Sequence, residues 1–217
     1  MVLDSEPSLP SQLGRMFDFV YLASQSPRRH ELLTQLGVSF RLLVAAPDED
    51  VEALEIAYAR ETPRHYVQRV TVLKAGAAVL RLQQRGGPPA PVLAADTTVA
   101  VRGKILGKPE SPAQARHMLR LLSGTTHRVL TAVAVTDGKR LILALSESRV
   151  SLRELSRAEI EAYVASGEPQ GKAGAYAIQG KAAAFVSHIS GSHSGIVGLP
   201  LFETAQALRA FRIRQNS

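Results

Sequence analysis

Residues 22–33 read LASQSPRRHELL, and they predict a short buried strand that passes directly into a helix. Ser26 is a favourable N-cap residue, and Pro27 fits the first position of the helix. Arg28 and Arg29 then fall in the first turn, where the helix dipole favours negative charge. A bound anion would explain these cations, because backbone N–H groups, hydroxyls and guanidinium groups would converge on its oxygens. The alternative is a helix start with two solvated arginines.

Strand and helix patterns alternate on both sides of this segment and predict an α/β fold. A Ser156 and Glu159 pair predicts a capping box, and an Asp137-Gly138 pair predicts a hairpin turn between two long strands. Because a hairpin lies among alternating units, we expect a mixed, partly antiparallel sheet flanked by helices. The expected strands are 21–23, 40–44, 92–95, a hairpin at 98–105, 127–135, 139–152 and 183–188, and the expected helices are 27–36, 63–84, 112–122, 156–167 and 200–211.

Residues 92–98 read VLAADTT, an apolar run that is followed by one carboxylate and two hydroxyls. We expect the strand to end at Asp96 and to place its carboxylate in a crevice. Such a group could bind a divalent cation or orient water, and the PDED run at residues 47–50 could supply a second carboxylate to the same ion. The alternative is local, since strands often end in Asp because this residue begins turns.

Two lysines are candidates for phosphate contacts. Lys74 lies in the long predicted helix at helical spacing from Val67 and Ala78, so it emerges on an apolar face. A lysine there either extends its ammonium group to solvent or meets a buried anion. Lys108 belongs to a GKP tripeptide. The longer string GKILGKP is no P-loop, because three residues separate its glycines and proline stands where Ser or Thr is needed.

Two glycine-rich segments, GKAGAYAIQG at 171–180 and GSHSGIVGLP at 191–200, permit a close approach of backbone to a flat ligand. Gln179 offers both a donor and an acceptor to the edge of a base. The GSHSG string is no hydrolase elbow, because His193 stands where the nucleophilic serine would be. The six histidines show no HExxH spacing, which gives a zinc peptidase almost no support, and His127 is expected to be structural.

The composition limits the class of protein. The chain has 217 residues, of which 45% are hydrophobic and 21% charged, as in ordinary globular proteins. It contains no cysteine, which excludes disulfide frameworks, thiol catalysis and thiolate zinc sites. The net charge of +7 favours a nucleic acid, an anionic membrane surface or a phosphorylated small molecule, or it is only a basic surface. Aromatic residues make up 5% and tryptophan is absent, which disfavours a base-stacking platform.

We expect residues 1–17 to form a disordered tail and residues 18–217 to form a single folded domain. Asp4 and Glu6 stand where a secretory signal would need basic residues. No stretch approaches the roughly 20 apolar residues that cross a bilayer. The expectation is therefore a cytoplasmic protein without a membrane partner.

The motifs SxSPRRxELL, ADT, GKP, LSGTTHRV, KAGAYAIQG and VGLP occur in this order between Leu22 and Glu203, and together they resemble the Maf family of nucleotide pyrophosphatases. The resemblance implies an elongated α/β fold, similar to that of inosine triphosphatase, with a phosphate-binding cleft between two lobes. It implies hydrolysis between the α and β phosphates of a nucleoside triphosphate with Mg2+ or Mn2+. Sequences with SPRR, DT and AIQG or GIQG are similar to the branch that acts on dTTP and UTP, whereas a branch that acts on 7-methylguanosine triphosphate departs at the last motif.

The resemblance also implies roles for individual residues. The base preference would be set by Arg28, Thr97 and Gln179. Asp96 would be the general base that orients or deprotonates water, directly or through the metal. The triphosphate is expected to lie across Ser24, Arg28, Arg29, Lys74 and Lys108, with the metal held by Glu49 and Asp96.

Two departures from the family pattern lie near the expected base pocket. His193 ends a GSH triplet where members usually show GSY, and Ala177 replaces a frequent glycine of GAYGIQG. A different nucleotide, such as 7-methylguanosine triphosphate or another modified purine, therefore stays an alternative substrate. A nucleic-acid-binding module without catalysis is an alternative from another class. It would place its cations along one stripe, whereas these sit at separate strand ends and helix starts, so no stable nucleic-acid complex is expected.

Two further expectations concern the whole protein. A homodimer is the ordinary assembly for a chain of this kind, and the family resemblance implies one too. The resemblance also leaves room for a role in cell division beside catalysis, because such a role has long been associated with the family's name.

Overall fold

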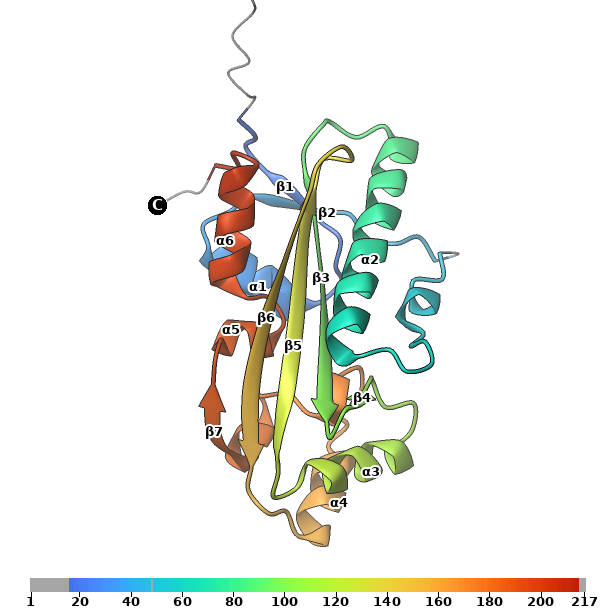
Figure 1. The fold of residues 1–217 in the computed structure, drawn as a ribbon, viewed down its shortest axis with the longest axis vertical. Helices are drawn as coiled ribbons and strands as arrows, with labels where there is room; N and C mark the ends of the chain where they lie inside the picture. The colour runs from blue at the N-terminus through green and yellow to red at the C-terminus, as the bar shows by residue number, and fades with distance from the viewer. Residues whose placement is uncertain (1–15, 48, 215–217) are drawn as a thin grey trace, which may run out of the picture.

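The structure, a computed structural model, describes residues 16–47 and 49–214 as one mixed sheet flanked by helices (Figure 1). The strands are β1 (Val20–Leu22), β2 (Phe40–Leu42), β3 (Val92–Val101), β4 (Lys104–Leu106), β5 (Thr126–Thr136), β6 (Leu141–Leu152) and β7 (Val186–Ser190). The helices are α1 (Pro27–Gln35), α2 (Pro63–Arg85), α3 (Pro112–Leu122), α4 (Arg157–Ala165), α5 (His193–Val197) and α6 (Leu201–Ala210), with 3-10 turns η1 (Glu52–Glu55), η2 (Ala173–Ala175) and η3 (Lys181–Phe185).

The strand order is β2-β1-β3-β5-β6-β7, and β4 pairs with β3 outside this path. Strand β1 pairs in parallel with β2 and β3, whereas the other pairings are antiparallel. The predicted α/β fold with a mixed sheet is therefore confirmed. None of the helices in the described ranges is both long enough and apolar enough to span a bilayer.

Alternate residues of the central strands face different helices, as the period of a strand requires. Val133 and Val135 of β5 pack with Leu93 of β3 in the apolar cluster that includes residues of α1 and α6. Ala132 and Ala134 instead belong to the clusters on the face that α2 covers. Small alanines on this face let the long α2 helix lie close to the sheet.

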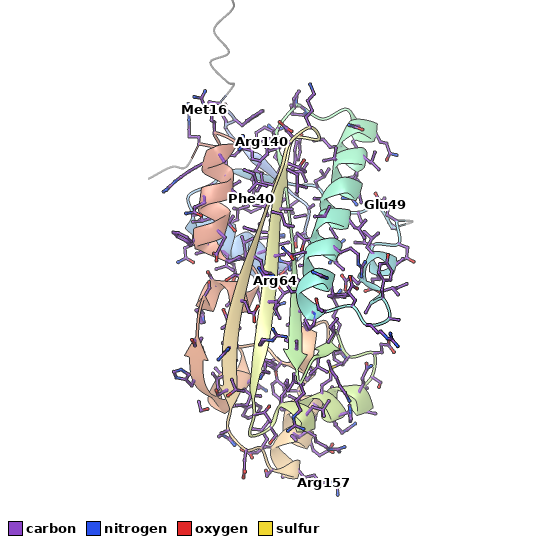
Figure 2. The ribbon with its side chains drawn as sticks, in the orientation of Figure 1. Met16, Phe40, Glu49, Arg64, Arg140 and Arg157 are labelled. Carbon is purple, nitrogen blue, oxygen red and sulfur yellow. The ribbon has the colours of Figure 1, made fainter. Side chains whose placement is uncertain are left out.

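The molecule is elongated along the β5–β6 hairpin, which extends through both of its ends (Figure 1). One end carries α1, α2 and α6, and the other carries α3 and α4, where the side chain of Arg157 lies (Figure 2). The largest apolar cluster joins α3 and α4 to the segment between Ala175 and Val197. Separate apolar clusters lie under α1, α2 and α6, so the two lobes expected from the family resemblance correspond to separate parts of the core.

Strand β3 does not end at Asp96, as the sequence predicted, but continues to Val101. On one edge, β5 pairs with β3 along nearly its whole length, including Asp96 with Ala132, so the backbone stays extended through the acid. On the other edge, β1 pairs with β3 only as far as Leu93, and the pairing with β4 begins at Val99. Within the described residues, 94–98 have no strand on that edge, and this unpaired edge opens beside Asp96.

The expected strand at 183–188 is also wrong at its start. Residues 181–185 form η3, and β7 begins only at Val186. Three consecutive alanines favour helical turns, and Ala182 and Phe185 are buried in the large apolar cluster. The capping box of Ser156 is confirmed, and the β3–β4 hairpin turns at residues 102–103 as predicted.

Most of the expected N-terminal tail, residues 1–15, lies outside the described residues. Phe17, which the sequence assigned to the tail, forms a β-bridge with Ile213 near the other end of the chain. The folded domain therefore includes at least Phe17 of the segment that was expected to be tail.

We expect Leu93→Ala to lower the free energy of unfolding by about 2–5 kcal/mol, because it leaves a cavity in the centre of the sheet. Leu93 is fully buried, whereas Leu141 at the start of β6 is 44% exposed and provides a matched control. Urea unfolding of both variants measures the effect. Equal, small losses for Leu93→Ala and Leu141→Ala would contradict the assignment of the core.

Candidate active site

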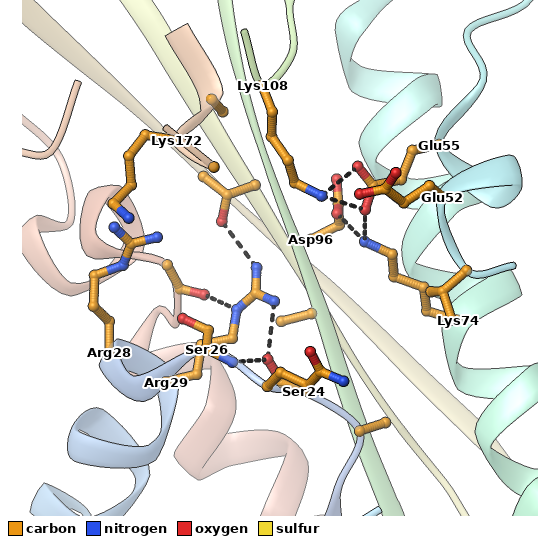
Figure 3. A pocket seen from close by; sticks show the side chains of 18 of the residues that line it. Ser24, Ser26, Arg28, Arg29, Glu52, Glu55, Lys74, Asp96, Lys108 and Lys172 are labelled. Carbon is orange, nitrogen blue, oxygen red and sulfur yellow. Dashed lines mark hydrogen bonds and ion pairs between the residues drawn. The ribbon is translucent and has the colours of Figure 1, made fainter. Parts of the chain in front are cut away.

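A cleft of about 790 Å3 lies beside the unpaired edge of β3. Its volume is in the range of small-molecule sites. Side chains from both lobes line it, and Figure 3 shows those near its centre. All the candidate residues from the sequence line this cleft, namely Ser24, Arg28, Arg29, Glu49, Lys74, Asp96, Thr97, Lys108 and Gln179.

Two carboxylates and two lysines, Asp96, Glu55, Lys74 and Lys108, form what we call the acid–lysine cluster (Figure 3). The Lys74 ammonium of α2 lies 2.6 Å from Oδ1 of Asp96 and 2.7 Å from Oε1 of Glu55. Lys108 lies 3.0 Å from Oε2 of Glu55. Lys74 on its apolar helix face therefore meets a buried anion, one of the two outcomes expected for it.

The two carboxylates of this cluster differ in their affinity for a proton. Burial raises the pKa of Asp96, which is only 7% exposed, although Lys74 and Arg29 act in the opposite direction. Burial also acts to raise the pKa of Glu55, but Lys74 and Lys108 together hold it below its usual value. The surroundings therefore shift the pKa values of the two carboxyl groups in opposite directions, and such opposed shifts are typical of acid–base sites.

Arg29 connects three parts of the cleft floor. Its Nε donates to the carbonyl of Gly198 at 2.8 Å, Nη1 to Ser24 Oγ at 3.4 Å and Nη2 to Thr97 Oγ1 at 3.3 Å. Thr97 Oγ1 also lies 3.0 Å from the hydroxyl of Thr131. The guanidinium group thus holds the start of α1, the middle of β3 and the end of α5 together.

The start of α1 presents polar groups to the cleft. Ser26 occupies the N-cap position, as predicted, but its side chain forms no capping hydrogen bond. Its hydroxyl instead lines the cleft. Arg28 also lines the cleft, and burial lowers the pKa of its guanidinium group, while Glu31 acts in the opposite direction.

Glu49 was expected to share a metal with Asp96, but the structure pairs its carboxylate with Arg81 of α2. Hydrogen bonds from Arg81 and the backbone of Ala46 lower the pKa of Glu49 to about 2. Glu55, which the sequence analysis did not select, is the carboxylate that lies next to Asp96. Both acids belong to one acidic stretch, and sequence spacing alone could not indicate which one folds towards β3.

The donor atoms in the cleft suit a hard divalent cation. Among residues 16–47 and 49–214, no group of three or more His, Cys, Asp or Glu side chains is assembled as a metal site. Mg2+ commonly takes one or two carboxylates and completes its shell with water and substrate phosphates. Asp96 and Glu55, whose oxygens already share one cation in Lys74, fit this requirement.

Comparison with known proteins assigns the chain to a family. A family model described as Maf-like protein matches residues 19–211. The chain belongs to the Maf family. Its relatives include proteins named dTTP/UTP pyrophosphatase. One of them, from Polaromonas sp. (strain JS666), is 62% identical over 193 residues, which are 89% of this chain and 96% of that protein. Another, from Cupriavidus pinatubonensis (strain JMP 134), is 61% identical over 199 residues, 92% of this chain and 100% of that protein.

In this Maf protein, the glycine-rich segment 171–180 packs directly on β3. Gly174 has a φ of +69°, and a Cβ there would lie 2.9 Å from Cγ1 of Val99. Its backbone N–H donates to the carbonyl of Gly107 at 3.0 Å. Only glycine combines this backbone conformation with so close an approach, which places Lys172 and Gln179 at the cleft.

A buried hydrogen bond holds the same segment to β5. Nε2 of His127 lies 2.7 Å from the Tyr176 hydroxyl, and the two rings meet edge to face. On the other side, Tyr163 of α4 accepts a hydrogen bond from the backbone N–H of Ala177 at 3.3 Å. His127 is therefore a structural residue, as expected, and it supports the wall of the cleft.

We expect His127 to make this Maf protein sensitive to acid. Burial lowers its pKa to about 4, against an ordinary value of about 6.5. The unfolded chain takes up this proton first, so the contribution of His127 is complete above pH ~6.5 and is lost as the pH falls towards 4. The loss in free energy of unfolding is on the order of 3 kcal/mol.

Urea unfolding at pH 7.5 and 4.5 measures this dependence. His127→Gln should lose much of the difference between the two pH values, whereas His188→Gln, at an exposed position of β7, should keep it. Full acid sensitivity in His127→Gln would show that other groups cause the loss.

Proposed function

We propose that this Maf protein hydrolyses dTTP and UTP to the nucleoside monophosphate and diphosphate. The observation that carries the proposal is a buried carboxylate of raised pKa, Asp96, at the centre of a cleft rich in cations. The name shared by relatives of about 60% identity over nearly their whole length supports the substrate class. The reaction that follows needs a base, several cations and a polar wall for the nucleobase.

Asp96 would take a proton from water as the water oxygen attacks the α-phosphorus. The bond between that phosphorus and the bridging oxygen of the β-phosphate breaks, and diphosphate leaves. Lys74, Lys108 and Arg29 would neutralise the charge that develops on the phosphate oxygens. Lys74 would then turn from its carboxylate partners towards the substrate, while Ser24 and Arg28 bind it at the start of α1.

A bound Mg2+ or Mn2+ would supply Lewis acidity and bring the triphosphate against the base. The residues proposed to hold it are Asp96 and Glu55, and Glu49 only if its carboxylate leaves Arg81. For the nucleobase we propose Gln179, Thr97 and Arg28. Gln179 is exposed in the cleft wall and offers both a donor and an acceptor.

We expect Asp96→Asn to lower turnover by about 10²–10⁴-fold, because it removes the proton acceptor and keeps the shape of the side chain. Diphosphate release from the common nucleoside triphosphates and 7-methylguanosine triphosphate, with Mg2+, Mn2+ or chelator, measures both rate and preference. Asp18→Asn, at an exposed side chain far from the cleft, is the control. An Asp96→Asn protein with most of its activity would overturn the assignment of the base, and no diphosphate from any nucleotide would overturn the function.

A second experiment tests whether Glu55 or Glu49 binds the metal together with Asp96. Glu55→Gln should raise the Mn2+ concentration needed for half-maximal activity by roughly tenfold or more, because it removes a charged oxygen donor beside Asp96. Glu49→Gln should change it little, since Glu49 is bonded to Arg81. The reverse order would return the metal to Glu49.

The state of the protein in the cell belongs to the same proposal. We propose a homodimer in the cytoplasm that forms no stable complex with nucleic acid. The mass of the protein in solution tests the homodimer, and its retention on duplex DNA at low salt tests the absence of a nucleic-acid complex.

A further inference from the structure

Two cations line the cleft on the side away from the acid–lysine cluster. Arg28 extends from α1, and Lys172 is the residue that directly precedes η2. Figure 3 shows the end of the Lys172 side chain beside the guanidinium group of Arg28, although the two residues are far apart in sequence. We call these two residues the basic pair.

Neither member of the basic pair forms an ion pair with the described residues. The Nε of Arg28 is buried and has no hydrogen-bond partner. The Lys172 ammonium donates a single long hydrogen bond, 3.4 Å, to the carbonyl of Gln170. Lys74, Lys108 and Arg81 differ in this respect, because each of them contacts a carboxylate. Arg29 forms no such ion pair, but its guanidinium group is hydrogen-bonded to neutral oxygens of the cleft floor.

The neighbourhood of the basic pair confirms that its charge is poorly balanced. Burial lowers the pKa of Lys172, the positive charge of Arg28 lowers it further, and Glu168 acts in the opposite direction. Two like charges in a partly buried cleft repel each other, and an acceptor placed between them would relieve that repulsion. The basic pair is thus positioned to receive electron-rich oxygen atoms.

The wall around the basic pair suits a nucleobase better than a phosphate chain. Lys172 belongs to the segment that also brings Tyr176, Ile178 and Gln179 to the cleft, so flat apolar surface lies next to hydrogen-bonding groups. The acid–lysine cluster, by contrast, presents only charged groups around Asp96. The triphosphate is therefore assigned to that cluster and the base to the wall that contains Lys172.

We propose that Lys172 is a specificity-determining residue, which together with Arg28 binds the carbonyl oxygens of a neutral base and repels a base that carries a positive charge. This inference rests on the proposed function, since it concerns the base of the same substrate. Uracil and thymine present two carbonyl oxygens and no charge. Guanine methylated at N7 carries a fixed positive charge, which two unneutralised cations would exclude.

The test compares nucleotides that differ mainly in charge. GTP and 7-methylguanosine triphosphate differ by a methyl group on N7, which adds a positive charge and removes one acceptor, so the ratio of their kcat/KM values responds to the charge of the base. Lys172→Met should shift this ratio by roughly tenfold in favour of the methylated nucleotide, the effect of one charge across a partly solvated cleft. It should also lower the preference for UTP over CTP, because cytosine replaces a carbonyl with an amino group.

Two further variants complete the experiment. Lys172→Arg keeps the charge and should show the same GTP to 7-methylguanosine triphosphate ratio as the unmodified protein. This result would exclude a merely structural effect of losing the lysine. Lys181→Met, at an exposed lysine nearby that does not line the cleft, should leave every ratio unchanged. Thermal unfolding of each variant shows whether it is folded.

Three results would overturn the proposal. An unchanged GTP to 7-methylguanosine triphosphate ratio in folded Lys172→Met would show that the lysine does not sense the charge of the base. An equal rise in KM for all nucleotides, together with weaker inhibition by inorganic diphosphate, would place Lys172 at the phosphates. A similar loss of discrimination in Lys172→Arg would assign it a structural role. Failure of the unmodified protein to hydrolyse any nucleotide is a different result, and it would overturn the proposed function itself.

Discussion

The unpaired edge of β3 is the constraint on which the cleft depends. Strand β1 pairs with β3 only as far as Leu93, and β4 pairs with it only from Val99 onwards, so the β3 residues between these two have no neighbouring strand on that edge. On the other edge they remain in register with β5, which keeps the backbone rigid around Asp96. The start of α1, the face of α2 and the segment 171–180 converge on this gap. A site built on such a strand is better defined than one built on loops alone.

The distribution of charge around the gap explains how a buried acid is tolerated. Removing Asp96 and Glu55 from water is costly, and it is offset because Lys74 contacts both of them. The acid–lysine cluster is thus nearly balanced before any ligand arrives. The basic pair, Arg28 and Lys172, is not balanced, so one cleft contains a region of nearly neutral charge and a region of positive charge.

Much of the fold could be predicted from local signals. The capping residues of α2, α3 and α4 and the Asp137-Gly138 hairpin act over a few residues, so the sequence predicts them directly. The continuation of β3 beyond Asp96 could not be predicted, because it depends on pairing with β5. The choice of Glu55 over Glu49 beside Asp96, and the meeting of Arg28 with Lys172, depend in the same way on contacts between distant segments.

The β5–β6 hairpin has a consequence for the order of folding. Its strands are joined by a short turn and pair from Thr136 with Leu141 outwards, so the hairpin closes with little loss of chain entropy. The parallel pairing of Tyr21 with Val92 must instead bring together residues from distant parts of the chain, which is slow. The gap beside Asp96 does not exist until β1 has docked on β3. The cleft is therefore among the last features to form, and a ligand bound in it stabilises only the completely folded chain.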